Sequence, residues 1–136
     1  MTVRQITLDT GALIAIERRK QRGLLLLDLA RHRLALLLVP VPVVVEWWRS
    51  RTDVRERVLE AVSVEPLSLA DARAAGEALA KVRGGPREKA LAIDAIVVAF
   101  AATHGGVVFT SDVGDLELIR TAHFPSVRIL GVGDDL

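Results

Sequence analysis

The sequence contains no cysteine, and this absence removes several classes of function. Without thiols the chain can form no disulfide, no thiolate zinc site and no cysteine nucleophile, and nothing argues for an oxidising compartment. Histidine is scarce as well, since only His32, His104 and His123 occur. Aromatic residues make up only 4% of the chain, so the 51% of hydrophobic residues predicts a core of Leu, Val and Ala.

Long hydrophobic runs are also missing. The longest apolar stretches, residues 34–45 and 91–102, are shorter than the roughly 20 residues of a membrane-spanning helix, and they contain Pro or Asp. The first apolar segment begins at Ile6 and is interrupted by Asp9, so it does not have the form of a signal peptide. We therefore expect a cytoplasmic protein with no membrane segment.

Lysine is rare, and arginine supplies most of the positive charge. The net charge is only +1, yet 15 of the 18 basic residues are Arg. Two groups stand out, one of Arg18, Arg19, Lys20 and Arg22 and the other of Arg49, Arg51, Arg55 and Arg57. Arginine is well suited to bidentate phosphate contacts, although a solvated helix face explains either group equally well when it is considered alone.

Strand-like and helix-like patterns alternate along the chain. The patterns predict strands at 3–8, 34–39, 107–110 and 127–130 and an extended segment at 63–67. They predict helices at 12–18, 24–33, 43–51, 53–62, 68–83 and 116–121, and a buried helix that begins at 87–89, after Gly84-Gly85-Pro86, and ends near 103. Strands that alternate with helices predict an α/β fold with a parallel sheet, and 136 residues fit one domain.

Four acids lie at strand ends or on helices that begin near one. Asp9 follows the first strand, Asp112 follows the strand at 107–110, and Asp94 lies in an almost wholly apolar helix, where an unpaired carboxylate is costly. Each acid has an ordinary explanation: Asp9 suits a helix N-cap, and Glu46 suits the start of a helix, where it complements the dipole. Ligands of parallel α/β sheets bind at the carboxyl ends of the strands, so we expect the four acids to converge there.

Converging carboxylates repel one another unless they are protonated or bridged by a cation. An all-oxygen ligand set favours Mg²⁺ or Mn²⁺ over zinc. Such ions bind phosphates and activate water, so acids near Arg-rich helices suggest hydrolysis of a phosphodiester.

The order of these motifs resembles that of the PIN-domain ribonucleases, and within them the VapC-type toxins of toxin–antitoxin pairs. The motifs are Asp9 after the first strand, Glu46 behind Val41-Pro42-Val43, Asp94 in Ile93-Asp94-Ala95, and Thr110-Ser111-Asp112 followed by Asp115. The resemblance covers essentially the whole chain, residues 1–136, as a single PIN-like domain. Each motif alone is weak, whereas the ordered set is fairly specific.

The resemblance implies a three-layer α/β/α fold with a central parallel sheet and a Mg²⁺- or Mn²⁺-dependent endoribonuclease. It implies catalytic acids at Asp9, Glu46, Asp94 and Asp112, with Asp115 as a fifth acid near the metal and Thr10 and Ser111 as polar groups that support the ligands. It also implies a homodimer and a VapB-like antitoxin that covers the active site. Because of their nearness in sequence to Asp9 and Glu46, Arg18, Arg19, Arg49 and Arg51 are the candidate contacts to the RNA substrate.

Three other interpretations compete with this one. Leu8-Asp9-Thr10-Gly11-Ala12 matches the signature of retroviral-type aspartic proteases, but those proteins are all-β and the helical patterns contradict such a barrel. A phosphoacceptor receiver domain needs a Lys at a late strand end, and only Lys20, Lys81 and Lys89 occur. A PIN fold without catalysis, which binds RNA or protein, is the third.

Trp47 and Trp48 are consecutive in a predicted helix. Their side chains therefore point about 100° apart and cannot share one core stripe. We expect one to pack inside and the other to line a dimer or antitoxin surface.

Overall fold

The computed structural model describes residues 3–82 and 91–131, which form a five-stranded parallel sheet with helices on both faces. The strands are β1 (Arg4–Leu8), β2 (Ala35–Pro40), β3 (Ser63–Glu65), β4 (Val107–Thr110) and β5 (Arg128–Gly131), in the order β3-β2-β1-β4-β5. The helices are α1 (Thr10–Glu17), α2 (Gln21–Arg31), α3 (Val41–Trp47), α4 (Asp53–Ala61), α5 (Leu69–Lys81), α7 (Ala92–Ala102) and α8 (Val113–His123).

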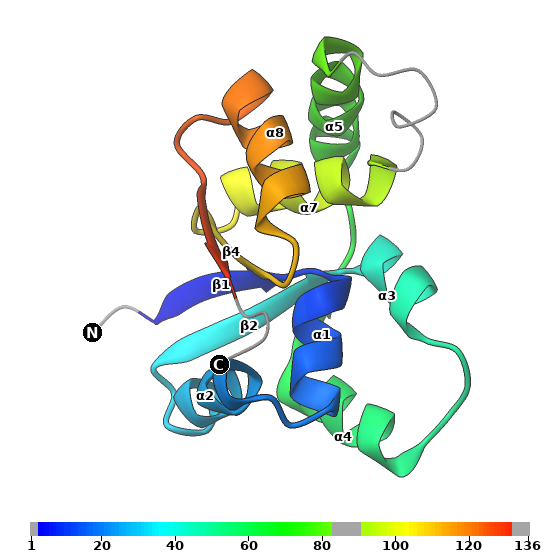
Figure 1. Cartoon of the computed structure of the whole chain (residues 1–136), viewed down its shortest axis with the longest axis vertical. Helices are drawn as coiled ribbons and strands as arrows, with labels where there is room; N and C mark the ends of the chain where they lie inside the picture. The colour runs from blue at the N-terminus through cyan, green and yellow to red at the C-terminus, as the bar shows by residue number, and fades with distance from the viewer. Residues whose placement is uncertain (1–2, 83–90, 132–136) are drawn as a thin grey trace.

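The helices form two layers around the sheet. Figure 1 shows α1, α2 and α4 on one side of β1 and β2, and α5, α7 and α8 on the other. The three-layer α/β/α architecture predicted from the sequence is therefore confirmed. An all-parallel sheet also excludes the all-β barrel of the aspartic proteases.

Burial explains the apolar patterns of the central elements. The end of β1 is fully enclosed, and six residues of α7 are buried, among them Val97, Val98 and Phe100. A parallel strand covered on both faces has no solvent side, which accounts for the burial of Ile6, Thr7 and Leu8 at the end of β1. The core therefore fixes β1, which Asp9 directly follows, and α7, which carries Asp94.

Helix boundaries differ from the prediction at several points; α2, for example, spans Gln21–Arg31 and not 24–33. The helix expected at 43–51 begins at Val41 and ends at Trp47, because Thr52 must be extended to cap α4, where its hydroxyl accepts a hydrogen bond from the Arg55 N–H at 3.0 Å. The helix expected at 116–121 is longer and begins directly after Asp112. The helix expected at 68–83 ends at Lys81, and the expected break at 84–86 and helix start at 87–89 lie outside the described residues.

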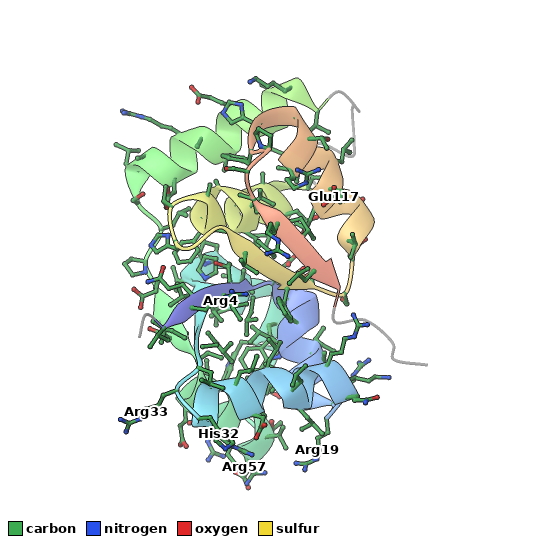
Figure 2. The ribbon with its side chains drawn as sticks, turned by 90° about the vertical axis from the view of Figure 1, so that its left-hand side faces the viewer. Arg4, Arg19, His32, Arg33, Arg57 and Glu117 are labelled. Atoms are coloured by element: carbon green, nitrogen blue, oxygen red, sulfur yellow. The ribbon has the colours of Figure 1, made fainter. Side chains whose placement is uncertain are left out.

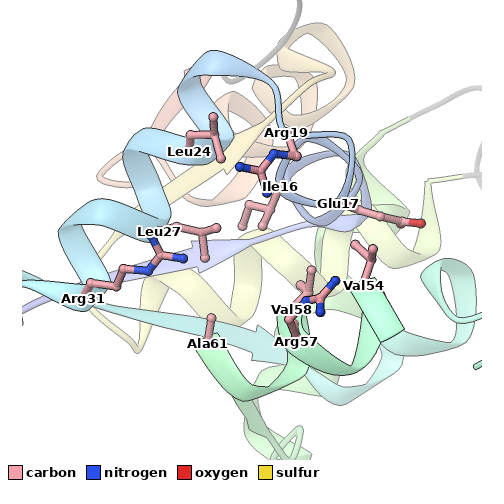
Figure 3. Close-up of a pocket in the computed structure, with 10 residues that line it drawn as sticks. All are labelled: Ile16, Glu17, Arg19, Leu24, Leu27, Arg31, Val54, Arg57, Val58 and Ala61. Carbon is pink, nitrogen blue, oxygen red and sulfur yellow. The ribbon is translucent and has the colours of Figure 1, made fainter. Parts of the chain in front are cut away.

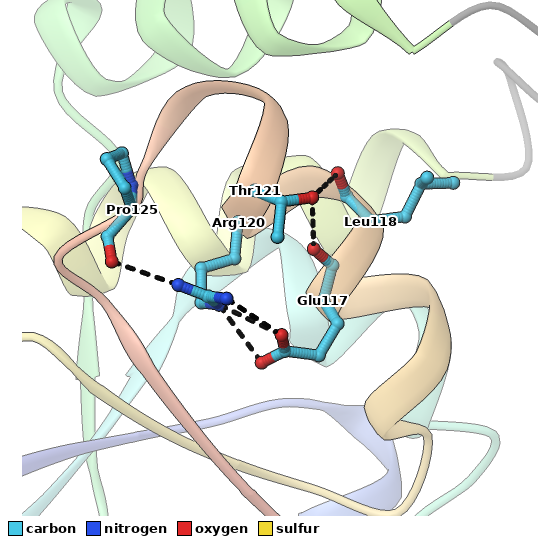
Figure 4. Close-up of polar contacts among 5 residues, drawn as sticks. All are labelled: Glu117, Leu118, Arg120, Thr121 and Pro125. Atoms are coloured by element: carbon cyan, nitrogen blue, oxygen red, sulfur yellow. Dashed lines mark hydrogen bonds and ion pairs between the residues drawn. The ribbon is translucent and has the colours of Figure 1, made fainter.

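Polar contacts tie the second helix layer together. Ser68 caps α5 by accepting a hydrogen bond from the Asp71 N–H. Both carboxylate oxygens of Asp71 accept from Thr103 Oγ1, at 3.1 and 3.0 Å, and so join α5 to the end of α7. On α8, Arg120 pairs with Glu117 and donates to the Pro125 carbonyl at 2.9 Å, which holds the turn that leads into β5 (Figure 4).

No helix within residues 3–82 and 91–131 combines the length and the hydropathy required to cross a membrane.

Candidate active site

Asp9 lies where β1 passes into α1 at the carboxyl edge of the sheet, and it is only 6% exposed. One carboxylate oxygen accepts a hydrogen bond from the Ala12 N–H at 2.9 Å, so Asp9 is the N-cap of α1. The other oxygen accepts from Thr110 Oγ1 at 2.5 Å, which ties the end of β4 to the end of β1. Each carboxylate oxygen has two lone pairs, so these bonds leave Asp9 able to bind a cation.

Glu46 reaches the same edge from α3. Its carboxylate is exposed and accepts a hydrogen bond from Thr10 Oγ1 at 2.6 Å, although the two residues are 36 positions apart. Thr10 stands next to Asp9 in the chain, so this bond brings the Glu46 carboxylate to the start of α1. Thr10 thus orients the Glu46 carboxylate.

Asp94 lies in the first turn of α7 and is half-buried. Burial is the largest cause that raises its pKa from 3.8 to about 7, and the charges of four further acids add to the shift. In decreasing order of effect these acids are Asp9, Asp115, Glu46 and Asp112. Five carboxyl groups from α1, α3, α7 and α8 therefore share one electrostatic environment.

Asp112 and Asp115 approach from the start of α8. Asp112 is exposed, and its charge contributes to the raised pKa of Asp9 as well as to that of Asp94. Burial is the largest cause of the raised pKa of Asp9, and the hydrogen bonds from Thr110 and Ala12 oppose it. Asp9 is thus more deeply buried than Asp94, although Asp94 lies in the more apolar helix.

Ser111 packs against the start of α1 at a point where only glycine fits. A Cβ atom at Gly11 would lie 1.9 Å from Ser111 Oγ and 2.9 Å from its Cβ. The Ser111 side chain is exposed, and the Thr110 hydroxyl accepts a hydrogen bond from the Asp112 N–H at 2.8 Å. Thr110, which the sequence did not single out as a supporting group, therefore positions both Asp9 and the backbone of Asp112.

The donor set fits a hard divalent cation. It consists of carboxylates and hydroxyls, the ligands that Mg²⁺ and Mn²⁺ prefer, and a bound cation would relieve the repulsion that raises the pKa of Asp94. Within the described residues no three acidic or histidine side chains are arranged as a ready-made metal cage. Glu46 and Asp112 are exposed, so their side chains are the ones with room to turn toward an ion.

A groove of about 340 Å³ lies beside Glu46, between α1, α3 and the start of α4. It is lined by Thr10, Ile14, Glu17 and Arg18 on one side and by Glu46, Trp47, Arg49 and Arg55 on the other. We call it the basic groove. Of the arginines singled out in the sequence, Arg18 and Arg49 line it, whereas Arg51 is exposed and pairs with Asp53 at 3.3 Å.

Glu17 and Arg55 also line the basic groove. Arg55 belongs to an arginine group noted in the sequence but was not selected as an RNA contact, and Glu17 was not noted at all. The available signal for Glu17 was its spacing from Thr10 and Ile14, which places the three residues on one face of α1.

A second groove, of about 160 Å³, lies between α1, α2 and α4 (Figure 3). Its walls are mainly apolar, with Ile16, Leu24, Leu27, Val54, Val58 and Ala61, and its charged residues are Glu17, Arg19, Arg31 and Arg57. We call it the apolar groove. Arg19 thus lies here and not beside the acids, and Figure 2 shows Arg19, Arg33 and Arg57 at the end of the molecule formed by α2 and α4.

The two tryptophans differ in burial, as expected. Trp47 is 2% exposed and packs in the core, while Trp48 is half-buried beside it, with ring centroids 5.9 Å apart. The expected difference in burial is confirmed, and the role of Trp48 at a dimer or antitoxin surface stays a prediction.

Comparison with known proteins gives one family and one fold. The family model for the PIN domain matches residues 6–122. A solved structure described as VapBC2 from Rickettsia felis bound to a DNA fragment from their promoter is similar to 93% of this chain and 98% of its own, with a TM-score of 0.57 and 15% sequence identity. No curated protein matches the sequence.

Proposed function

The chain belongs to the PIN-domain family, and from that premise we propose that it is a Mg²⁺- or Mn²⁺-dependent endoribonuclease and the toxin of a VapBC-type pair. One observation carries the catalytic part of the proposal: four acids raise the pKa of the half-buried Asp94. A fold gains no stability from such repulsion, so the arrangement is best explained by a cation that binds there.

Each acid would have a distinct part in holding that cation. Asp9 is fixed by the Ala12 N–H and by the Thr110 hydroxyl, so it would be the rigid ligand. Glu46 is exposed and oriented by Thr10, so it would be the adjustable one. Asp94 and Asp112 would complete the catalytic set, with Asp115 near the metal and Ser111 as a further polar support. The chemistry that a bound Mg²⁺ or Mn²⁺ supplies is activation of water and neutralisation of charge on the phosphodiester.

The basic groove supports RNA as the substrate. Arg18 and Arg49 line it beside Thr10 and Glu46, so a strand whose phosphate lies at the acids could place a neighbouring phosphate between two guanidinium groups. Contacts of this kind hold the backbone whatever the base, so specificity for one RNA would have to come from other contacts.

The apolar groove supports an antitoxin partner. Leu24 and Val54 in its walls are 36% and 39% exposed, and arginines outnumber acids around it. It suits an amphipathic segment that has both apolar and acidic residues, and we propose that a VapB-like antitoxin places such a segment here while its C-terminal part covers the acids. The exposed Val41 and Val45 on α3, next to the half-buried Trp48, support a homodimer surface. Such a pair would act in the cytoplasm.

The nuclease is tested on a mixed-sequence single-stranded RNA. We expect cleavage with Mg²⁺ or Mn²⁺, none in EDTA, and loss of cleavage in Asp9→Asn, Glu46→Gln, Asp94→Asn and Asp112→Asn, each of which should stay folded. The four residues act as a unit, so a double variant should be little worse than a single one. Cleavage that persists in EDTA would contradict the proposal. RNA binding without any cleavage would favour a catalytically silent PIN module.

The partner is tested with the product of the adjoining reading frame. Co-purification with wild type and loss of the complex in Val54→Glu are expected, because a charge would then lie in the apolar groove. An unchanged complex would place the partner elsewhere.

A further inference from the structure

Glu17 is the last residue of α1, and both of its carboxylate oxygens hold the segment that follows Glu46. Trp47 donates its indole N–H to one oxygen at 2.9 Å, and Arg55 Nε lies 3.3 Å from the other. The Glu17 and Arg55 side chains are only 21% and 18% exposed, so solvent screens this ion pair incompletely.

Arg55 depends on Glu17 for its orientation. Arg55 Nε is enclosed and makes no hydrogen bond within the described structure, so its ion pair with the Glu17 carboxylate provides the compensation for its buried charge. The other end of the guanidinium donates to the Ser50 carbonyl at 2.8 Å. Glu17 thereby fixes Trp47 directly and the backbone at Ser50 through Arg55.

These two anchors bracket Arg49. Arg49 lies between Trp47 and Ser50, in the stretch where α3 has ended and α4 has not begun, so no helical hydrogen bonds hold it. Its side chain is exposed and lines the basic groove, as Glu17 and Arg55 do. Glu46, in contrast, is held independently by Thr10.

We propose that Glu17 is a positioning residue, which sets the wall of the basic groove that receives the RNA backbone while leaving the acids in place. The inference rests on the proposed nuclease function. It predicts an effect on KM with little effect on kcat, since the anchors fix Arg49 and Glu46 has its own hydrogen bond.

The test is Glu17→Gln, which keeps an oxygen that can accept from the Trp47 indole but removes the charge that compensates Arg55. KM for a mixed-sequence single-stranded RNA should rise about fivefold, as expected for loss of roughly 1 kcal/mol of positioning by a charge-assisted contact. Simple electrostatics predicts the opposite sign, because removal of an anion from a phosphate-binding groove strengthens RNA binding. Glu60→Gln, an exposed acid of α4, is the matched control for that general charge effect.

A second measurement, of the Trp47 indole by NMR, needs no RNA. The indole N–H resonance of Trp47 should shift in Glu17→Gln, because its acceptor changes from a carboxylate to a neutral amide, and stay unchanged in Glu60→Gln, both measured well below the melting temperature. If wild type cleaves RNA and the KM of Glu17→Gln is unchanged or lower, the inference about Glu17 is overturned and the nuclease proposal stands. An unshifted indole resonance would also overturn the inference about Glu17. A wild type that cleaves no RNA would overturn the nuclease proposal and the RNA-binding role of Glu17, while the resonance would still report whether Glu17 holds Trp47.

Discussion

Asp94 carries a carboxyl group with a pKa of about 7 on a helix that is otherwise apolar. Burial and four neighbouring acids raise this pKa, so the folded protein keeps a proton that the unfolded chain releases above about pH 4. The folded state then binds more protons than the unfolded state between about pH 4 and pH 7, and the stability of the metal-free protein falls as the pH rises through that range. The raised pKa of Asp9 acts in the same direction.

Replacing Asp94 by Asn should remove most of this penalty. In EDTA the melting temperature of Asp94→Asn should exceed that of wild type at pH 7, and the difference should shrink toward pH 4, where the wild-type carboxyl keeps its proton in both states. Thermal melts across this pH range measure it. A variant that is less stable than wild type at pH 7 in EDTA would mean that Asp94 is a structural acid with a favourable partner.

Gly11 should tolerate no side chain. Because a Cβ would lie 2.9 Å from Ser111 Cβ, a contact that rotation of the Ser111 hydroxyl cannot relieve, Gly11→Ala should push apart the turns that carry Asp9 and Asp112 and cost about 1–3 kcal/mol of unfolding free energy, as for other overpacked sites. Gly76→Ala is the matched control, since a Cβ there meets nothing within 4 Å and a helical Gly→Ala change stabilises by up to about 1 kcal/mol. Adding Ser111→Gly to Gly11→Ala should recover part of the loss. Equal stability of Gly11→Ala and wild type would contradict the close packing.

Single residues show where prediction from the sequence ends. Of the five acids named from their order in the chain, the four others do contribute to the raised pKa of Asp94, because elements at the carboxyl ends of parallel strands share an edge of the sheet. The hydrogen bond from Thr10 to Glu46 and the contacts of Glu17 with Trp47 and Arg55 join residues that are 30 or more positions apart. No local pattern encodes which acid a given hydroxyl or arginine meets, so the sequence left these contacts unknown.

At the scale of elements, the hydrophobic patterns of the sequence predicted the presence of the helices and of most strands, whereas they did not predict the residues at which the helices begin and end. The chain from Trp47 to Thr52 continues the polar and apolar spacing of a helix, but the cap of α4 requires Thr52 to be extended. Because α3 ends at Trp47, Arg49 lies outside the helix and lines the basic groove, whereas Arg51 does not line it and pairs with Asp53.

Arg18 and Arg49, which line the basic groove, should therefore differ from Arg51 in their effect on RNA binding. Binding to single-stranded RNA should weaken with salt, and loss of one phosphate contact should flatten the log–log slope by about 0.7. We expect this from Arg18→Ala and from Arg49→Ala, and no change of slope from Arg51→Ala, the matched control. Equal slopes in all three variants and wild type would mean that Arg18 and Arg49 make no phosphate contact and are ordinary solvated surface residues.

At the scale of the whole molecule, the alternation of strands and helices was enough to predict the fold class, since successive parallel strands must be joined by crossovers that cover the sheet. The order β3-β2-β1-β4-β5 was not predictable in this way. It places β1 in the centre with β4 beside it, which brings Asp9 and Thr110 into contact although they are 101 positions apart.

The central claim is that the acids at this edge hold a divalent cation, and metal-linked stability tests it most directly. A ligand that binds only the folded state stabilises it by about 2.7 kcal/mol at 100 times its dissociation constant. Thermal melts of wild type and Asp94→Asn in EDTA and in saturating Mn²⁺ should show a large upward shift for wild type and little shift for the variant. An unshifted wild type, or an equal shift in both proteins, would contradict a cation site centred on Asp94.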